Sequence, residues 1–290
     1  MRSPRSRTRF VRHPMKTIRV RGWAGFKREI QKLRESYSID HRTTSEGEVI
    51  KSKVLMLFRG QADSKWDLLT TLERRTSETF DVARYAERAS RIRHELESFT
   101  GRSWSVPDFA AIQAEIKAEQ RMTYVHLPSY DYLVFLRHHG FPSPLLDWTE
   151  SPFIAAYFAY VDAAKSHPVV FCYVERPNSV KGGTVGDASI QVCGKYVTTD
   201  KRHFAQKAWY TIATKWSRAQ ERHTFCRHSD VFARDEDSQD LLFKIVLPRG
   251  GREEAMRELG DFNINHFTLF QSTDALVRTL ELTTFGSRDV

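Results

Sequence analysis

The sequence predicts an α+β fold, because segments with helical spacing fill its first half and short apolar segments typical of strands follow in its second half. Its 290 residues are 40% hydrophobic and 28% charged, which is an ordinary globular composition. A chain of this length can bury a full core, either as one large domain or as two small ones.

The first half is expected to be mainly helical. Residues 23–37 place Trp23, Phe26, Ile30 and Leu33 on one face of a helix, and a polar stretch then leads to an apolar strand over 54–58. Further helices are expected over 68–72, 76–100, 110–122 and 130–137, and residues 1 to about 17 read as irregular.

The middle of the chain combines a proline-rich link with a well-defined helix start. Pro142 and Pro144 favour an extended link, and residues 145–149 then form a short strand or a loop. Ser151 and Pro152 are typical of an N-cap followed by proline at the first helical position. They predict a helix over 153–164.

The second half turns to strands. Residues 169–174 form an apolar run after a proline, and weaker strand candidates lie at 190–197, 224–227 and 241–247. A short helix is expected over 253–259, and a last helix begins at about Ser272.

The net charge of +9 is concentrated at the N-terminus, where the basic residues precede the first acidic residue, Glu29. We expect residues 1–22 to form a flexible basic tail that attracts polyanions, nucleic acid above all. The candidate contacts are Arg5, Arg7, Arg9 and Arg12. The alternative is a solvated tail without a specific partner.

Other features exclude several classes of protein. The three cysteines fit neither a zinc pattern nor a disulfide scaffold, and the adjacent His138 and His139 point apart on a helix, so no metal is expected. No apolar run is long enough to span a bilayer, and the basic N-terminus lacks the apolar segment of a secretory signal. We expect a reduced, cytoplasmic protein.

The segment Phe58-Arg59-Gly60 is the first candidate for chemistry. An arginine at a strand end suits a bidentate grip on phosphate or carboxylate, and a glycine lets a ligand approach the backbone closely. The alternative is a structural ion pair at the end of the strand.

Two further segments carry candidate site residues. Asp147-Trp148-Thr149 offers a carboxylate, an indole and a hydroxyl before a helix, unless the aspartate only caps a turn and the indole fills the core. Glu221 enters a predicted strand and could bind a sugar hydroxyl, although an ordinary edge charge explains it equally well.

Together these segments resemble a known family. The order F-R-G-Q, then H-x-G-x-P-S-x-L-L-D-W-T-x-S-P-x-x-A-A-x-F-A, is similar to the FRG domain of bacteria and phages. The resemblance covers roughly residues 23 to 280 and implies one domain over 23–290. It departs from the family at Arg137, which replaces a usual glutamine before His138, at Pro144 in place of a frequent arginine, and at Gln271 in place of a proline.

The FRG layout in turn resembles the arginine–serine–glutamate class of ADP-ribosyltransferases, which implies helices packed on a mixed, mainly antiparallel split β core. By that resemblance Arg59 would bind NAD and share catalysis with Glu221. Gln220 is the alternative to Glu221, because FRG members often show Q-x-G-x-F there. The other residues implied in NAD binding are Gly60, His138, Asp147, Trp148 and Thr149.

The resemblance implies an NAD-dependent ADP-ribosyltransferase that acts as a toxin or anti-phage effector. Its acceptor would be nucleic acid, either RNA or single-stranded DNA, and a neutralising protein would control it. Two alternatives are a non-catalytic module that binds nucleic acid or nucleotides and an NAD glycohydrolase. Cleavage of the nicotinamide–ribose bond passes through a cationic sugar, so arginine, aromatic and carboxylate side chains suit it.

Overall fold

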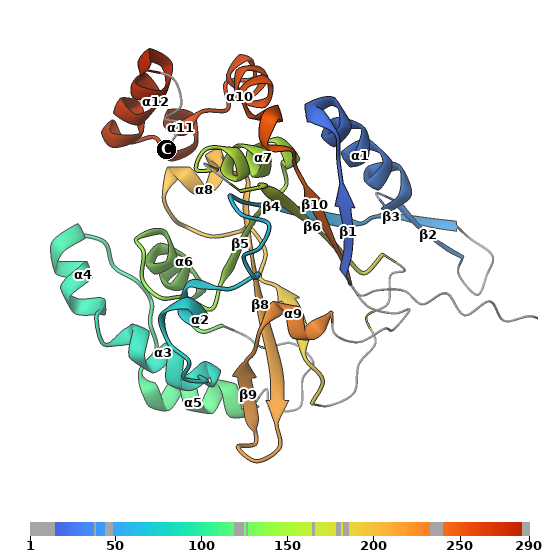
Figure 1. The fold of residues 1–290 in the computed structure, drawn as a ribbon. Coiled ribbons are helices and arrows are strands. Elements are labelled where there is room, and N and C mark those ends of the chain that lie inside the picture. The colour runs from blue at the N-terminus through green and yellow to red at the C-terminus, as the bar shows by residue number, and fades with distance from the viewer. Residues whose placement is uncertain are drawn as a thin grey trace, which may run out of the picture.

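The computed structural model describes residues 15–37, 39–43, 49–118, 125, 127–163, 166–177, 181, 186–232 and 240–285 (Figure 1). The strands are β1 (Met15–Arg19), β2 (Ile39–Thr43), β3 (Val49–Lys53), β4 (Leu55–Gln61), β5 (Leu146–Thr149), β6 (Val169–Glu175), β7 (Ser189–Val192), β8 (Ala208–Ser217), β9 (Arg222–Phe225) and β10 (Leu241–Val246). The helices are α1 (Gly22–Tyr37), α2 (Thr71–Arg75), α3 (Val82–Ser90), α4 (Arg93–Thr100), α5 (Phe109–Ala118), α6 (Tyr130–His138), α7 (Pro152–Tyr160), α8 (Lys201–Ala205), α9 (His228–Val231), α10 (Arg252–Asp261), α11 (His266–Phe270) and α12 (Thr273–Phe285). A 3₁₀ turn, η1, covers Arg249–Gly251.

An eight-stranded sheet organises the molecule. Its order is β1-β10-β6-β4-β5-β8-β7, and β9 pairs with β8. Among the described strands, only the β1–β10 pair is parallel, so the sheet is mainly antiparallel. Strands β2 and β3 form a separate hairpin. The fold therefore combines helices with a mainly antiparallel sheet, which agrees with the predicted α+β class.

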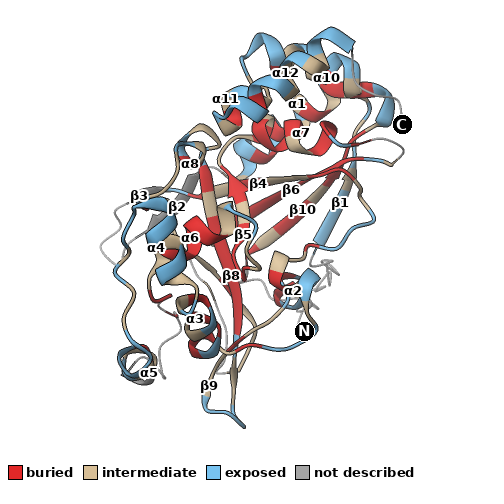
Figure 2. Ribbon diagram, turned by 90° about the vertical axis from the view of Figure 1, so that its left-hand side faces the viewer, coloured by how far each residue is buried: buried red, intermediate tan, exposed pale blue. Residues whose placement is uncertain are grey.

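Both faces of the sheet are covered. On one face, helices α1, α7 and α10 pack on β4, β6 and β10 through a core that includes Trp23, Phe26 and Tyr160. On the other face, α9 covers β6 and β8. Helices α3 and α6 pack on the same face as α7, where they cover Tyr210 and Ile212 of β8. Figure 2 shows the burial concentrated on the central strands and α7, whereas α4 and α12 are largely exposed.

Most of the predicted helices are present, with shifted boundaries. Ser151 caps α7 by accepting a hydrogen bond from the Ile154 amide, and Pro152 begins the helix, but α7 ends at Tyr160. The single helix predicted over 76–100 is instead α3 and α4. Asp81 caps α3 and forms an isolated bridge to Thr224, which keeps the residues before α3 out of the helix.

Several strands were not predicted. Residues 15–19, assigned by sequence to the basic tail, form β1 and pair with β10, and α1 begins at Gly22. The polar stretch after α1 supplies β2 and β3. The most consequential omission is β8, a ten-residue strand of which the weak candidate at 224–227 is only the partner. Among the described residues, none of the helices has the length and apolar character that a bilayer crossing requires.

Candidate functional site

Three neighbouring strands, β4, β5 and β8, hold the candidate site. Phe58 on β4 pairs with Thr149 on β5, and β5 runs antiparallel to β8. A cavity of about 370 Å³ opens beside this junction, within the size range of small-molecule sites. The predicted site residues that line it are Arg59, Gly60, His138, Asp147, Trp148 and Thr149.

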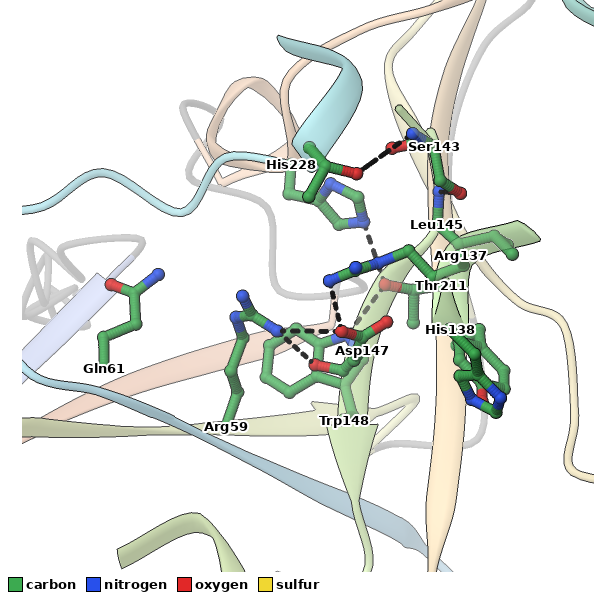
Figure 3. Close-up of polar contacts among 12 residues, drawn as sticks. Arg59, Gln61, Arg137, His138, Ser143, Leu145, Asp147, Trp148, Thr211 and His228 are labelled. Carbon is green, nitrogen blue, oxygen red and sulfur yellow. Dashed lines mark hydrogen bonds and ion pairs between the residues drawn. The ribbon is translucent and has the colours of Figure 1, made fainter. Parts of the chain in front are cut away.

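Arg59 is fixed by the strand beside it. Its Nη1 donates a hydrogen bond to the Asp147 carbonyl oxygen at 2.9 Å and lies 3.8 Å from Oδ2 of the same residue. Arg137 from α6 donates to that Oδ2 from the other side, so both guanidinium groups converge on one carboxylate (Figure 3). Burial lowers the pKa of Arg59 to about 10, an effect that Asp147 opposes. Arg59 therefore stays charged at neutral pH.

Gly60 serves the packing of α7 on β4. A Cβ atom at this position would lie 1.9 Å from the Ala155 carbonyl oxygen and 2.6 Å from the Ala159 nitrogen. No rotamer relieves such a contact, because both atoms belong to the helix backbone. The close approach that we expected for a ligand is thus made by a helix of the same chain, although Gly60 also borders the cavity.

Trp148 is part of the core. Its side chain is buried, with its ring centroid 5.6 Å from that of Tyr173. Its Nε1 donates to Thr211 Oγ1 at 2.8 Å, and this hydroxyl also pairs with His228 Nε2 at 2.9 Å (Figure 3). We expected this indole to offer a stacking face to a ligand. It is instead fixed by the buried hydrogen bonds that link it through Thr211 to His228.

Thr149 and His138 are also engaged within the protein. Thr149 Oγ1 accepts a hydrogen bond from the Ser151 amide and so shapes the turn into α7. His138 Nε2 pairs with the Tyr210 hydroxyl at 2.7 Å. Burial, with a smaller contribution from Arg202, lowers the pKa of His138 to about 4, so this imidazole is neutral at pH 7.

The predicted catalytic glutamate lies elsewhere. Glu221 and Gln220 are exposed in the turn between β8 and β9, where Glu221 has a φ of +48°. Neither lines the cavity, and Figure 1 shows this hairpin at the end of the sheet opposite α7 and α8. The predicted tail contacts Arg5, Arg7, Arg9 and Arg12 lie outside the described residues.

The structure adds residues that sequence reasoning missed. Three more arginines line the cavity, Arg74 from α2, Arg137 from α6 and Arg202 from α8. Gln61 directly follows the F-R-G segment and Trp66 lies shortly after it, so proximity in the sequence is a usable signal for both. Arg202 has no such signal in the sequence, because α8 is not among the predicted helices.

Gln206 lines the cavity beside the start of β8. Gln206, Ala208 and Tyr210 all line the cavity. Ala208 and Tyr210 lie on one side of β8, and Gln206 lies in the turn between α8 and β8. Gln206 Nε2 donates to the Leu269 carbonyl at 3.1 Å, which leaves its Oε1 as an acceptor. The sequence Gln206-Lys207-Ala208-Trp209-Tyr210 fits Q-x-G-x-F, with alanine and tyrosine as the replacements, better than the segment at Gln220.

Unsatisfied polar atoms gather around the cavity. Among the described residues, the buried atoms without a hydrogen-bond partner include Arg59 Nε, Arg137 Nε, Arg202 Nε, Gln61 Oε1 and Asp147 Oδ1. Most buried polar groups in proteins are paired, so such a concentration marks a place where a polar partner is expected. With four arginines and two aspartates among the described residues of its lining, the cavity favours an anion.

A metal site has no support from the side chains that are described, since no three His, Cys, Asp or Glu residues among them come together. Comparison with known proteins finds no match among curated proteins and none among solved structures. The match that is found covers less of the chain than the predicted span of 23 to 280. Residues 55–167, which contain Arg59, Arg74, Arg137 and Asp147, match the model of the FRG domain family, and the predicted FRG resemblance is confirmed over that stretch.

Proposed function

We propose that this chain binds NAD in the cavity beside Arg59 and transfers ADP-ribose from it to an acceptor. The convergence of four guanidinium groups on one cavity carries the proposal. Arginine grips phosphate oxygens in a bidentate manner, and the pyrophosphate of NAD supplies such oxygens. The guanidinium groups belong to Arg59, Arg74, Arg137 and Arg202.

The arrangement of the strands supports the same proposal. In the resembling transferases an arginine ends one strand, the next strand carries a polar motif and runs into a helix, and a later strand brings the last residue. Here β4 carries Arg59, β5 carries Asp147 to Thr149 and leads into α7, and β8 follows Gln206 on the far side of β5. Gln206 takes the place of the expected glutamate.

These residues suit the reaction, although an amide, Gln206, stands where the reaction favours a carboxylate. The bond between the nicotinamide nitrogen and the ribose carbon breaks, nicotinamide leaves with the electron pair, and the acceptor's hydroxyl or amino group bonds to that carbon and loses its proton to water. Arg59 and Arg137 would hold the phosphates, and Gln206 Oε1 would accept a hydrogen bond from a ribose hydroxyl. A neutral amide stabilises positive charge less than a carboxylate does, so we expect slow turnover.

Nicotinamide release from NAD, measured with the full chain and a mixture of nucleic-acid and protein acceptors, tests the proposal. Arg59→Ala removes charge-assisted hydrogen bonds of roughly 1.5–3 kcal/mol, so release should fall about tenfold to a hundredfold. Gln206→Ala should lower it as well. Glu221→Gln is the matched control and should leave the rate unchanged. A loss of release in Glu221→Gln comparable to that in Arg59→Ala would refute this assignment of the site.

A non-catalytic nucleotide-binding module is the second candidate. It is favoured by one observation, that no glutamate lies among the described residues that line the cavity. Calorimetric titration with NAD separates the two functions. Binding that Arg59→Ala weakens, without nicotinamide release under any acceptor condition, would establish the module and exclude the transferase.

A further inference from the structure

A second hollow lies between α2 and the β8–β9 hairpin. Its volume is about 660 Å³. It is lined by residues 70 and 72–80 from α2 and its flanks and by the hairpin residues Ala213, Lys215 and Phe225, together with Arg227. Arg74 lines this hollow and the Arg59 cavity alike. Its charge also lowers the pKa of Arg59. The two hollows therefore meet at Arg74.

The basic and acidic side chains that line the second hollow differ in whether they have partners among the described residues. Arg74, Arg75, Lys215 and Arg227 are exposed, and none of them forms an ion pair with another described residue. Of the three acidic residues in the lining, Glu73 accepts a hydrogen bond from the Thr70 amide at 2.7 Å. Glu78 pairs with two further arginines, Arg84 at 2.6 Å and Arg88 at 3.2 Å. Asp230 is the third acidic residue in the lining.

A half-exposed indole lines the Arg59 cavity, as Arg74 does. Trp66 belongs to the loop between β4 and α2, lines the Arg59 cavity, and is 56% exposed. Unlike Trp148, it presents its ring to solvent. Cations that form no ion pair with a described residue, in a hollow that adjoins a cavity with an exposed aromatic ring, are a combination by which proteins hold single-stranded nucleic acid, with phosphates on the cations and a base on the ring.

We propose that a single strand of RNA or DNA lies in the hollow between α2 and the β8–β9 hairpin and reaches the Arg59 cavity past Arg74. The strand's phosphates contact Arg75, Lys215 and Arg227, and Trp66 stacks on a base at the mouth of the cavity. A duplex fits less well, because its paired bases are not available to stack on Trp66. The claim that the bound strand accepts ADP-ribose rests on the proposed function. The claim that a single strand binds here does not.

Fluorescence anisotropy with a labelled single-stranded oligonucleotide tests the proposal on the full chain. In the variant Arg75→Glu/Lys215→Glu/Arg227→Glu we expect affinity to fall at least tenfold. Each phosphate contact adds roughly 0.7 to the slope of log affinity against log salt, so the loss of three contacts should make the slope shallower by about 2. The matched control is Arg28→Glu/Arg249→Glu/Arg257→Glu, a reversal of three exposed cations on α1, η1 and α10. It should retain the wild-type slope.

Trp66→Ala tests base stacking separately from charge. It should weaken binding of the oligonucleotide about tenfold, and leave unchanged the binding of an abasic sugar–phosphate strand of equal length. RNA and DNA strands of one sequence, compared side by side, identify the preferred acceptor. Equal loss for the normal and abasic strands, or equally tight binding of polyglutamate, would overturn the assignment to nucleic acid.

Two further outcomes decide where the strand binds. If the groove variant keeps wild-type affinity and Arg5→Ala/Arg7→Ala/Arg9→Ala/Arg12→Ala loses it, the N-terminal segment is the contact and the groove proposal is wrong. NAD titration of the groove variant should match wild type, because Arg59 and Arg74 are intact. A chain that never binds NAD but still shows the groove-dependent slope would refute the proposed function and leave the nucleic-acid site standing.

Discussion

At the scale of single residues, the site is held by a buried polar chain behind its arginines. Asp147 offers its carbonyl to Arg59 and its carboxylate to Arg137. Directly behind them, Thr211 links the Trp148 indole to His228, and the charge of Arg59 contributes to keeping His228 neutral. The position of Arg59 thus depends on residues that no ligand needs to touch.

Thr211→Val is the variant that tests this buried chain. Valine keeps the shape of threonine but leaves Trp148 Nε1 and His228 Nε2 without their common partner, and each buried unpaired group costs about 1–3 kcal/mol. We expect the free energy of unfolding to fall by roughly 2–4 kcal/mol, measured by urea denaturation. Thr211→Ser keeps the hydroxyl and should lose less than half as much. Equal losses in the two variants would show that packing, not the hydroxyl, is what matters.

The site residues differ in how well the sequence could predict them. Arg59, Asp147 and Trp148 stand in apolar segments where a charge or a large polar group is unexpected, and the structure brings them together. Glu221 was chosen because it preceded a predicted strand, and that strand is only the outer partner of β8. The strand that borders the cavity, β8, is absent from the predicted elements.

At the scale of secondary-structure elements, β4 and α7 are fitted to one another. Phe58 and Gly60 face α7, where the glycine allows the helix backbone to approach the strand, and Arg59 faces the other side. The F-R-G segment therefore combines two requirements in consecutive residues, a packing contact on one face and a charge on the other.

Gly60→Ala should disrupt this packing. The added methyl group would collide with backbone atoms of α7 at 1.9 and 2.6 Å, so the helix must move away from the strand. Overpacking of this kind costs typically 1–3 kcal/mol, and a contact with rigid backbone lies at the upper end. We expect a loss of about 3 kcal/mol in the free energy of unfolding. Gly260→Ala, where a Cβ atom meets nothing within 4 Å, is the control and should not destabilise. Equal stability of both variants would contradict the role of Gly60.

Elements with regular patterns were predictable, and those defined by tertiary pairing were not. The apolar spacing of α1 and the Ser151-Pro152 start of α7 identify these helices directly. By contrast, β1 is a charged five-residue segment that becomes a strand only because β10 offers it an edge. Strand β8 did carry a signal, because A-W-Y-T-I-A-T-K-W-S is rich in aromatic and β-branched residues, and that signal was overlooked.

At the scale of the whole molecule, the arginines of the cavity lie near buried histidines that stay neutral at pH 7. Burial, with Arg59 as the second cause, lowers the pKa of His228 to about 3, and burial lowers that of His138 to about 4. Both residues lie beside the Arg59 cavity or its supporting chain. The region can therefore hold several guanidinium groups without adding imidazolium charges at neutral pH.

These histidines predict that the fold loses stability in mild acid. An unfolded histidine has a pKa of about 6.5, so as the pH falls below that value the unfolded chain takes up protons that the folded chain refuses. The stability is complete above about pH 6.5 and declines toward the folded pKa near 3. Between pH 7 and pH 5 His228 alone should remove about 2 kcal/mol from the free energy of unfolding.

His228→Gln isolates this contribution in urea denaturations at pH 7, 6 and 5. Glutamine can still pair with Thr211 but does not titrate, so the variant should be less stable at pH 7 and lose about 2 kcal/mol less than wild type between pH 7 and pH 5. The difference between the two curves is the measured quantity, because the carboxylates that titrate in this range contribute equally to both. Parallel curves would mean that His228 takes up a proton in the folded protein, and the neutral surroundings of Arg59 would then be wrong.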